Sequence, residues 1–407
     1  MPLEIRPIEP DEVLAYRRAV RFGFSTPDTT DDADWASAMF DPIDRCIAAF
    51  DRDRIVATLR SFATELTLPG GATVPAGALT AVTCHPTHRR QGVLTQMLGS
   101  DLAASRARGE PCGVLIAAEY PIYGRFGYGP ATVATAWELD ARAANFANRG
   151  AGTVEFADDE TLRKEAPAIF DRVRRARPGM IDRSEFVWDY RCAIRRAPDD
   201  KPWSGFRLLC RDDDGMAQGW ANYTFEDKWE GMRSFDKVDV VDLCAATPEA
   251  EARLWRFLAE LDLVATIAAA DRPLDDTLPW LLHDARVAKC SRTHDFVWVR
   301  PLDVAHLLSE RAYTTAGQVV IDVVDPQGFA NGRVRVDATA DGATCMPTSN
   351  SADLTVPVRT LGAVVLGGHR VRMLHTAGWL DEHTPGAVAV ADRLLAGDVA
   401  PWCNTWF

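Results

Sequence analysis

Residues 82–94 read Val-Thr-Cys-His-Pro-Thr-His-Arg-Arg-Gln-Gly-Val-Leu, and they join a predicted strand to a predicted helix. The strand spans residues 79–84, and Pro86 ends its ladder because proline has no N–H to donate. The helix spans residues 91–108, with apolar side chains on one face and Gly109 as its C-terminal stop. This alternation of period-2 and helical spacing predicts a domain that mixes strands and helices.

The start of this helix is a predicted anion site. The first backbone N–H groups of a helix have no partner within the helix and carry partial positive charge, so they bind phosphate well. Gly92 allows close approach of the backbone to an anion, and Arg89 and Arg90 add positive charge at the rim. A basic helix start without a ligand remains an alternative for this segment alone, because short glycine-containing motifs are weak evidence.

A second informative segment follows the next predicted strand, at residues 113–118. It reads Glu119-Tyr-Pro-Ile-Tyr-Gly-Arg-Phe-Gly-Tyr-Gly-Pro130. A tyrosine has a pKa of about 10, so at neutral pH it carries a proton that it can donate. The competing interpretation is a packed aromatic turn, in which Tyr120, Phe126 and Tyr128 belong to the core.

Length and composition exclude several classes of protein. The chain has 407 residues, of which 47% are apolar and 25% charged, so it is globular and long enough for two to four domains of about 100–200 residues. The longest apolar run, residues 263–270, is far shorter than the ~20 residues of a membrane span. The first residues, Met1-Pro-Leu-Glu-Ile-Arg, do not resemble a signal peptide, and a cytoplasmic location is expected.

Charge and cysteine spacing narrow the choice of partners. Lys and Arg number 45 against 58 Asp and Glu, and this net charge of −13 argues against nucleic acid and agrees better with a small cationic substrate. The nine cysteines form no C-x-x-C pair, which argues against a structural zinc site or a disulfide framework. No metal site and no membrane partner are predicted.

The pattern divides the chain into three predicted domains, residues 1–147, 153–299 and 300–407, with a glycine-containing linker at 148–152. The last is a small α+β domain of alternating strands and two helices. Residues 79–86 and the helix after them resemble residues 240–248 and their following helix, since both read strand, proline, helix. We therefore predict a degenerate internal repeat.

The motifs resemble those of a known family. A strand followed by R/Q-x-x-G-x-G/A is the acyl-coenzyme A signature of GCN5-related N-acetyltransferases; Arg89 and Gly92 match it, whereas Leu94 stands where Gly or Ala is usual. With the run Ile-Tyr-Gly-Arg-Phe-Gly-Tyr-Gly-Pro-Ala at 122–131, the whole chain resembles the Eis (enhanced intracellular survival) acetyltransferases. The resemblance implies an α+β fold: tandem acetyltransferase domains with mixed sheets flanked by helices, the second degenerate, and a C-terminal sterol-carrier-like domain.

The resemblance also implies roles for individual residues. Tyr123 would be the general acid, and the terminal carboxylate of Phe407 would be the general base. The implied acetyl-CoA contacts are Val82, Thr83, Cys84, Arg89, Arg90, Gln91, Gly92, Val93, Leu94, Thr95, Ala118 and Glu119. Family members acetylate amines of aminoglycosides, polyamines or lysine side chains and assemble as hexamers, so a cationic amine acceptor and a homohexamer are expected. The repeat, with Glu249 and Glu251 at its helix start, would repel a pyrophosphate and is predicted not to bind coenzyme A.

An acceptor site is predicted near the N-terminus. Four aspartates, Asp28, Asp31, Asp32 and Asp34, cluster before or beside Trp35, in a loop that commonly covers the acceptor pocket of acetyltransferases. Carboxylates there would attract ammonium groups, and Asp28, Asp31 and Trp35 are the candidate substrate contacts. The competing interpretation for most of these aspartates is capping of the helix that contains Trp35.

The C-terminus is unusually aromatic, with Trp402, Trp406 and Phe407 among its last six residues. Most termini are frayed and polar, so three large rings predict that this one docks onto an apolar surface. A free carboxylate has a pKa of about 3.5 and needs burial or a relaying water to act as a base at neutral pH. Because Trp406 is apolar, the tail brings no side-chain carboxylate to a polycation, which weakens the expectation of an aminoglycoside acceptor.

We predict direct attack of a primary amine on acetyl-CoA, with backbone N–H groups of residues 82–84 polarising the thioester carbonyl. The rival hypothesis is a non-catalytic sensor that binds acyl-CoA or a lipid, the lipid being carried by the third domain. Arg89, Arg90, Gly92 and Tyr123 favour the enzyme, because a sensor has no use for a general acid.

Overall fold

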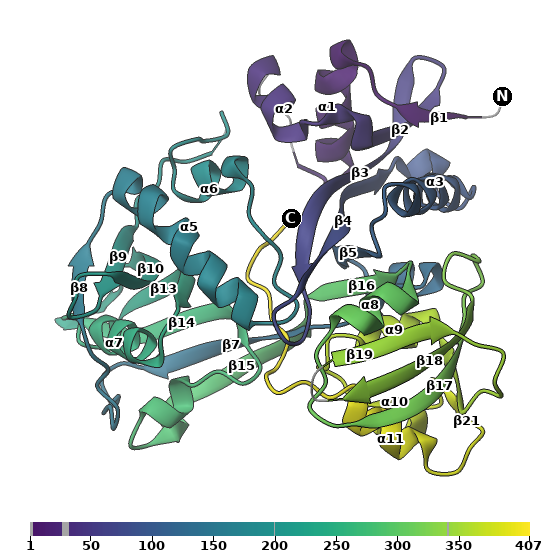
Figure 1. Cartoon of the computed structure of the whole chain (residues 1–407). Helices are drawn as coiled ribbons and strands as arrows, with labels where there is room; N and C mark the ends of the chain where they lie inside the picture. Colours follow the sequence, from purple (N-terminus) through teal and green to yellow (C-terminus); the bar gives the residue numbers. More distant parts are fainter. Residues whose placement is uncertain (1–2, 27–31, 199, 340–341) are drawn as a thin grey trace.

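The computed structural model describes residues 3–26, 32–198, 200–339 and 342–407. These residues form two seven-stranded sheets and one five-stranded sheet, each with helices packed against it (Figure 1). The C-terminus lies in the centre of the molecule, between the first two sheets. Among the described residues, no helix combines the length and the apolar character that crossing a membrane requires.

The first sheet contains the predicted anion loop at the end of its fourth strand. Its strand order is β1 (Glu4–Pro7), β2 (Cys46–Asp51), β3 (Arg54–Thr67), β4 (Thr73–Cys84), β5 (Cys112–Ile116), β16 (Val297–Pro301) and β6 (Gly129–Pro130). Its helices are α1 (Val13–Gly23), α2 (Ala33–Phe40), α3 (Val93–Ala107) and α4 (Tyr120–Tyr123). Helix α3 buries Val93, Met97 and Leu98 against one face of the sheet, as its apolar spacing predicts.

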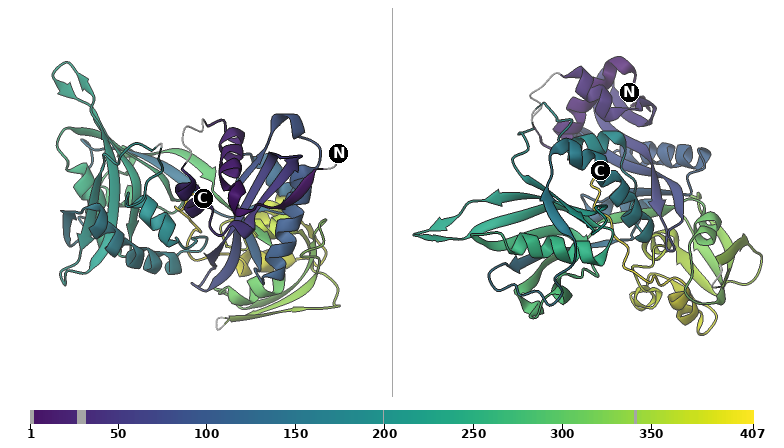
Figure 2. Two further views of the ribbon diagram at one scale, coloured as in Figure 1. Left: turned by 90° about the horizontal axis from the view of Figure 1, so that it is seen from above. Right: turned by 60° about the vertical axis from the view of Figure 1, so that its left-hand side comes forward.

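The second sheet repeats this plan. Its strand order is β15 (Ala288–Asp295), β7 (Val133–Asp140), β14 (Val264–Pro273), β13 (Asp236–Ala245), β10 (Ala217–Glu226), β9 (Phe206–Arg211) and β8 (Thr153–Phe156). Helices α5 (Asp159–Ala176) and α6 (Glu185–Arg191) pack with one face, and α7 (Pro248–Ala259) packs with the other. The short strands β11 (Trp229–Glu230) and β12 (Arg233–Ser234) form a projecting hairpin (Figure 2).

The third sheet has the order β19 (Gly342–Pro347), β18 (Gly332–Thr339), β17 (Gly317–Val324), β20 (Leu354–Pro357) and β21 (Asp381–Glu382). Its helices are α8 (Val304–Glu310), α9 (Val358–Val364), α10 (Val371–Thr376) and α11 (Ala387–Leu394). Its core is continuous with one face of the first sheet. A buried ion pair joins the two parts, because Arg300 of β16 donates to Asp325 over 2.7 Å.

The predicted repeat is present in the strand connections. β4 pairs antiparallel with β3 and parallel with β5, and β13 pairs antiparallel with β10 and parallel with β14. A helix follows each of these central strands, α3 in the first domain and α7 in the second. The two domains therefore share one topology, which confirms the internal repeat.

The sheets do not follow the predicted regions of the sequence. Strand β7, from the first region, lies in the second sheet between β14 and β15, and β16, which straddles the boundary near residue 299, lies in the first sheet between β5 and β6. Each exchanged strand has ladder partners on both of its edges. A local pattern identifies a strand but not its partners, because pairing is a long-range property.

A stretch that has the pattern of one strand forms two. The apolar pattern of residues 47–61 predicts a single strand, but β2 ends at Asp51 and β3 begins at Arg54. The hairpin turns at Arg52, whose φ is 57°. Turns of this kind favour Gly, Asn or Asp, and the charged Asp-Arg-Asp run contains no glycine to mark the break.

Candidate active site

The first domain opens between the ends of β4 and β5. The two strands are paired only from Ala76–Cys112 to Leu79–Leu115, although β4 stays paired with β3 as far as Cys84. Ala81 has a φ of 51° and lies at a shift in the β3–β4 register, as in a β-bulge. Beyond the bulge, the β5-facing edge of residues 82–84 lies outside the described ladders and can pair with an extended ligand.

The anion loop lies at the mouth of this opening. Gly92 is the N-cap of α3 with a φ of 78°, and no side chain caps the helix. A Cβ added at Gly92 would meet no described atom within 4 Å, so the first-turn N–H groups face open space. Arg90 is also left-handed, at φ 63°, and Arg89 bends back so that its Nε donates to the Cys84 carbonyl over 3.3 Å. Successive N–H groups in such a loop form a concave cradle for an anion.

The side chains of this loop divide into exposed and buried groups. Arg89, Arg90, Gln91 and Thr95 are exposed, as a contact to a charged group requires. Leu94 is half-buried, and Val93 packs in the core of the first domain, so their contribution to a ligand comes from the backbone.

The two histidines of the loop have supporting roles. His85 caps the short turn after β4, since its side chain accepts a bond from the Thr87 N–H, and its ring stacks on Phe22 at 4.9 Å. Partial burial, together with the charges of Arg54 and His88, lowers the pKa of His85, so the ring is neutral at pH 7. The positive charge of the loop therefore comes from the arginines.

Tyr123 lies on the α3 face of the first sheet. It is 8% exposed and packs in one hydrophobic cluster with Leu79 of β4 and Val93 of α3. Burial, and then the negative charge of Glu119, raise the pKa of Tyr123 to about 12. The hydroxyl therefore keeps its proton at neutral pH. Ala118 and Glu119 are exposed in the segment between β5 and α4.

The glycines that follow Tyr123 allow the third domain to approach. A Cβ at Gly129 would lie 1.9 Å from the Arg359 carbonyl of α9. Phe126 and Tyr128 are buried, as predicted, but Tyr120 is 52% exposed, which corrects its predicted place in the core. Tyr120 instead packs its edge on Trp298 of the exchanged strand β16, at 4.8 Å between ring centroids.

The terminal residue, Phe407, packs on the face of the first sheet that is opposite to Tyr123. The ring of Phe407 packs edge-on against Phe62 of β3, at 5.6 Å, and contacts the cluster that includes Val114. Successive side chains of a strand point to opposite faces, and Leu115, next to Val114, belongs to the cluster of Tyr123. Tyr123 and Phe407 thus lie on the two sides of the sheet that opens between β4 and β5.

Trp35 of the first domain packs against the second domain. It is 9% exposed and packs on α6 of the second domain, 5.4 Å from Phe186 and 6.1 Å from Tyr190. Asp32 caps its helix by accepting a bond from the Trp35 N–H over 2.8 Å, which agrees with the capping interpretation for that aspartate. Asp28 and Asp31 lie outside the residues that the structure describes.

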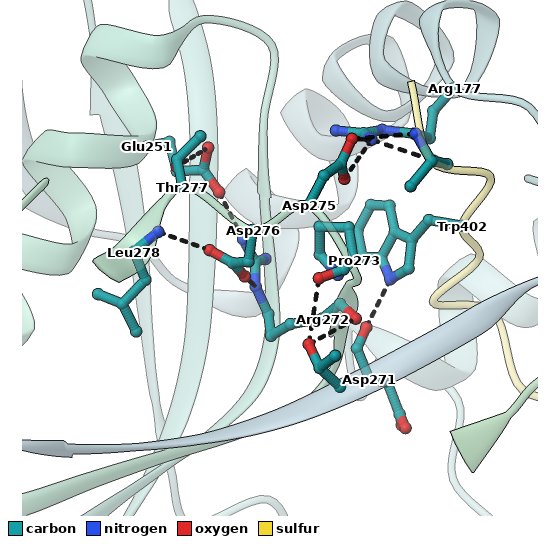
Figure 3. A network of polar contacts seen from close by, with 12 residues as sticks. Arg177, Glu251, Asp271, Arg272, Pro273, Asp275, Asp276, Thr277, Leu278 and Trp402 are labelled. Atoms are coloured by element: carbon teal, nitrogen blue, oxygen red, sulfur yellow. Dashed lines mark hydrogen bonds and ion pairs between the residues drawn. The ribbon is translucent and has the colours of Figure 1, made fainter. Parts of the chain in front are cut away.

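The second domain closes the equivalent opening. Thr247 caps α7 through a bond from the Ala250 N–H, where the first domain has an uncapped glycine. The parallel pairing of β13 with β14 ends at Val240 and Ala269. The buried side chain of Arg272 fills the space beyond it (Figure 3).

Arg272 is held on all sides. Its Nη1 donates to the Leu243 carbonyl over 3.0 Å, its Nε to Asp276 over 2.6 Å, and its Nη2 to Glu251 at the start of α7. Glu251 thus faces inward in an ion pair with Arg272. Sequence reasoning placed this carboxylate at the helix start but missed its partner.

A further set of residues was missed by sequence reasoning. Arg183, Arg191 and Asp242 of the second domain surround Asn404 near the end of the chain. The signal available was Asp242 itself, a charged residue inside the otherwise apolar run of residues 240–245. Among the described residues, no group of three or more His, Cys, Asp or Glu side chains is arranged to hold a metal ion.

Family profiles match the chain in three consecutive parts. Residues 4–131 and residues 179–301 each match an acetyltransferase (GNAT) domain, and residues 304–404 match a sterol carrier protein domain. The first match ends just before β7, which belongs to the second sheet. The second match includes β16, which belongs to the first sheet.

Whole-chain comparisons give the same result. The chain is 39% identical to an uncharacterized N-acetyltransferase from Streptomyces avermitilis, over 100% of this chain and 99% of that protein. It is 32% identical to N-acetyltransferase Eis from Mycobacterium tuberculosis, over 82% of this chain and 81% of that protein. The crystal structure of Eis1 from Mycobacterium abscessus matches with a TM-score of 0.87 and 29% identity, covering 99% of this chain and 100% of that one.

Proposed function

The chain belongs to the Eis-like GCN5-related N-acetyltransferases, and we propose that it transfers an acetyl group from acetyl-CoA to a primary amine of a cationic acceptor. The family and the α+β fold are those predicted from the sequence, and the chain is accordingly an acyltransferase. The identity of the donor, the acceptor and the residues that carry the reaction is our proposal.

The observation that carries the proposal is the opening between β4 and β5 beside an uncapped helix start. The cradle formed by Arg90, Gly92 and the first turn of α3 matches a pyrophosphate in charge and in the space left free. The edge of residues 82–84 offers backbone groups to an extended amide chain such as pantetheine. When bound, acetyl-CoA supplies a thioester whose carbonyl carbon an amine can attack.

Tyr123 is the proposed general acid. Its hydroxyl holds a proton at Oη, because burial and Glu119 raise its pKa to about 12. It donates that proton to the leaving thiolate, which needs a proton near neutral pH. The buried environment also strengthens the hydrogen bond that the hydroxyl offers.

The carboxylate of Phe407 is the proposed general base. It accepts a proton from the acceptor amine as the amine nitrogen attacks the thioester carbonyl carbon, directly or through a water molecule. Its ring packs on Phe62, on the face of the sheet opposite Tyr123, so acid and base approach the opening from two sides. The backbone N–H groups of residues 82–84 are the proposed donors to the thioester carbonyl oxygen.

We propose an acceptor that combines positive charge with an apolar or aromatic surface. The net charge of −13 supports a cation. Trp35, which packs with Phe186 and Tyr190, supports contact with an apolar body or a cation–π contact with an ammonium group. Asp28 and Asp31 remain proposed contacts. The acceptor classes to compare are aminoglycosides, polyamines and lysine side chains.

The test is thiol release from acetyl-CoA with a panel of these amines, for the wild type and for a chain that lacks Phe407. We expect turnover by the wild type and a loss of about 10²–10⁴-fold in kcat on deletion, the range of a missing general base. Added formate should restore part of the lost activity by replacing the carboxylate.

Two controls keep this result interpretable. A chain with one glycine appended after Phe407 keeps the ring and moves the carboxylate, and it should lose activity to a similar extent. Light scattering must show the same assembly for each variant; we propose a homohexamer. Full activity in the deleted chain would keep the enzyme and reject the base, whereas no turnover with any amine would favour a sensor.

A further inference from the structure

The last residues of the chain are bound to the second domain at alternate positions. The Trp402 indole donates to the Asp271 carbonyl over 2.6 Å, and the Trp406 indole donates to the Asp271 carboxylate over 2.7 Å. Between them, Asn404 donates to Asp242 over 2.9 Å. An extended chain turns successive side chains to opposite sides, so one side of the tail faces the second domain.

On the other side of the tail, Cys403 and Phe407 face the first and third domains, whereas the Thr405 hydroxyl between them reaches Arg183 of the second domain. Cys403 is fully buried in the cluster that those two domains share, and Phe407 packs against the same cluster. A slip of one residue would exchange the two sides and turn Phe407 toward the second domain. The register set at Asn404 therefore decides where the terminal carboxylate lies.

Asn404 is held by a buried polar network. Arg183 donates to the Asn404 carbonyl over 3.3 Å, and Arg191 donates to the same oxygen over 3.1 Å. Both guanidinium groups also bind Asp242, at 3.1 and 3.4 Å. The Arg183 side chain is fully buried, and its Nε reaches the Thr405 hydroxyl over 3.0 Å. Such a network fixes a single arrangement, because breaking one partner leaves a buried charge.

The tail contacts the second domain beside the gap between β13 and β14. This gap corresponds to the β4–β5 opening, where the first domain is proposed to bind its cofactor. Trp402 packs with Cys244 of β13, and its indole N–H binds the Asp271 carbonyl of β14, so it bridges the ends of the two strands that separate (Figure 3). Its ring also lies 5.8 Å from the Arg272 guanidinium that fills the opening. The degenerate domain thus binds a peptide at the place that corresponds to the β4–β5 opening.

We propose that the second domain is the clamp that positions the Phe407 carboxylate, with Asp242, Arg183 and Asn404 as positioning residues. This inference rests on the proposed role of that carboxylate as the base. At the position where the first domain is proposed to bind acetyl-CoA, the second domain therefore binds the C-terminal tail. The carboxylate of that tail serves the first domain.

The experiment compares Asn404→Ala with Ser234→Ala in the full chain. Ser234 is the control, since it is also a buried, hydrogen-bonded polar side chain of the second domain: on β12, its hydroxyl donates to the Leu263 carbonyl over 2.8 Å. For Asn404→Ala we expect kcat to fall about tenfold to a hundredfold, the usual result of misplacing a reacting group, with an unchanged KM for acetyl-CoA. Ser234→Ala should keep the wild-type kcat.

A second measurement reports on the tail without using activity. Carboxypeptidase A removes C-terminal phenylalanine from flexible chain ends, and it should release Phe407 slowly from the wild type and from Ser234→Ala. It should release Phe407 at least tenfold faster from Asn404→Ala and from Asp242→Asn. The Asp242→Asn variant tests the network from the domain side, and Asn404→Ala remains informative if that variant fails to fold.

The two proposals fail in different ways. Unchanged kcat and unchanged protection of Phe407 in Asn404→Ala, in a chain that turns over, would overturn the clamp alone. Fast release of Phe407 with unchanged kcat would keep the clamp and overturn the role of the carboxylate as base. Equal effects of Ser234→Ala and Asn404→Ala would show a general loss of stability and overturn the assigned positioning role.

Discussion

The two acetyltransferase domains begin their central helices differently. The first starts α3 at Gly92, with Arg89 and Arg90 beside it and no side-chain cap. The second starts α7 at Thr247, which caps the helix itself and is followed by Glu249 and Glu251. Since a capped, acidic helix start already satisfies its N–H groups and its dipole, only the first is prepared for a phosphate.

The openings beyond these helices differ in the same sense. The first lies between β4 and β5 with Tyr123 on one side and Phe407 on the other. The second is filled by Arg272 and bridged by Trp402. The two domains share one topology, so the comparison shows that the fold supplies the opening and that a few side chains decide what occupies it.

The largest effect is expected from Tyr123→Phe, which removes the acid from the open domain. We expect kcat to fall about 10²–10⁴-fold. The pKa of Tyr123 is raised to about 12, so the hydroxyl keeps the proton that it donates at any pH well below that value. The wild-type rate should therefore show no loss from Tyr123 between about pH 7 and pH 10. Steady-state kinetics across this range are the measurement.

The matched control for this variant is Tyr223→Phe, a buried tyrosine on β10 of the closed domain. It should keep the wild-type kcat. Equal losses in the two variants would remove the distinction between the domains, and an unchanged rate in Tyr123→Phe would reject the assigned acid.

The next effect is on stability, from Arg272→Met in the closed domain. This change leaves the buried carboxylate of Asp276, and that of Glu251, without their partner. The free energy of unfolding should fall by about 3–5 kcal/mol, as for other broken buried ion pairs. Denaturant titration measures it. The control is Arg256→Met, from an exposed pair with Glu260, which should cost no more than about 0.5 kcal/mol.

The number of acetyl-CoA molecules bound per chain in Arg272→Met gives a further test of the difference between the two domains. Calorimetry should find one acetyl-CoA bound per chain in the wild type and in Arg272→Met, because the capped helix start of α7 remains. A second bound molecule in Arg272→Met would show that Arg272 alone closes the second domain.

The smallest effect is expected from Arg90→Glu. This change gives the loop before α3 a negative charge, like the one at the start of α7. The KM for acetyl-CoA should rise about tenfold while kcat changes little, since a rim charge contributes to binding more than to chemistry. Initial rates at low salt measure it. Arg149→Glu adds the same charge in the exposed linker and should leave the KM unchanged. Equal KM values in both variants would place the phosphates elsewhere.

Much of this architecture could be predicted from local patterns. The strands around β4 and β13, the helices after them and the anion loop all follow from apolar spacing and from Gly92 and Pro86. The carboxylates at the start of the second domain's helix, Glu249 and Glu251, were also visible in the sequence, and the absence of coenzyme A binding that they indicate stays a prediction. These features depend on neighbours in the chain, which is why a sequence pattern reports them.

Other features could not be predicted in this way. The aromatic-turn interpretation gave Tyr120 a core or supporting place, but its side chain is exposed and its ring contact is with Trp298 of the exchanged strand β16. The packing of Trp35 with Phe186 joins residues from two domains. No local pattern reports such contacts, since they depend on how separate sheets are arranged.

The sequence by itself determined the family, the repeated strand–loop–helix units and the difference in charge between their helix starts. Only the tertiary structure decided which strands the sheets exchange, that Arg272 fills the second opening, and that Asn404 sets the register of the tail. The reason is physical. Helix starts and strand periodicity are set by residues a few positions apart, whereas buried ion pairs and strand partners are chosen by packing between distant segments.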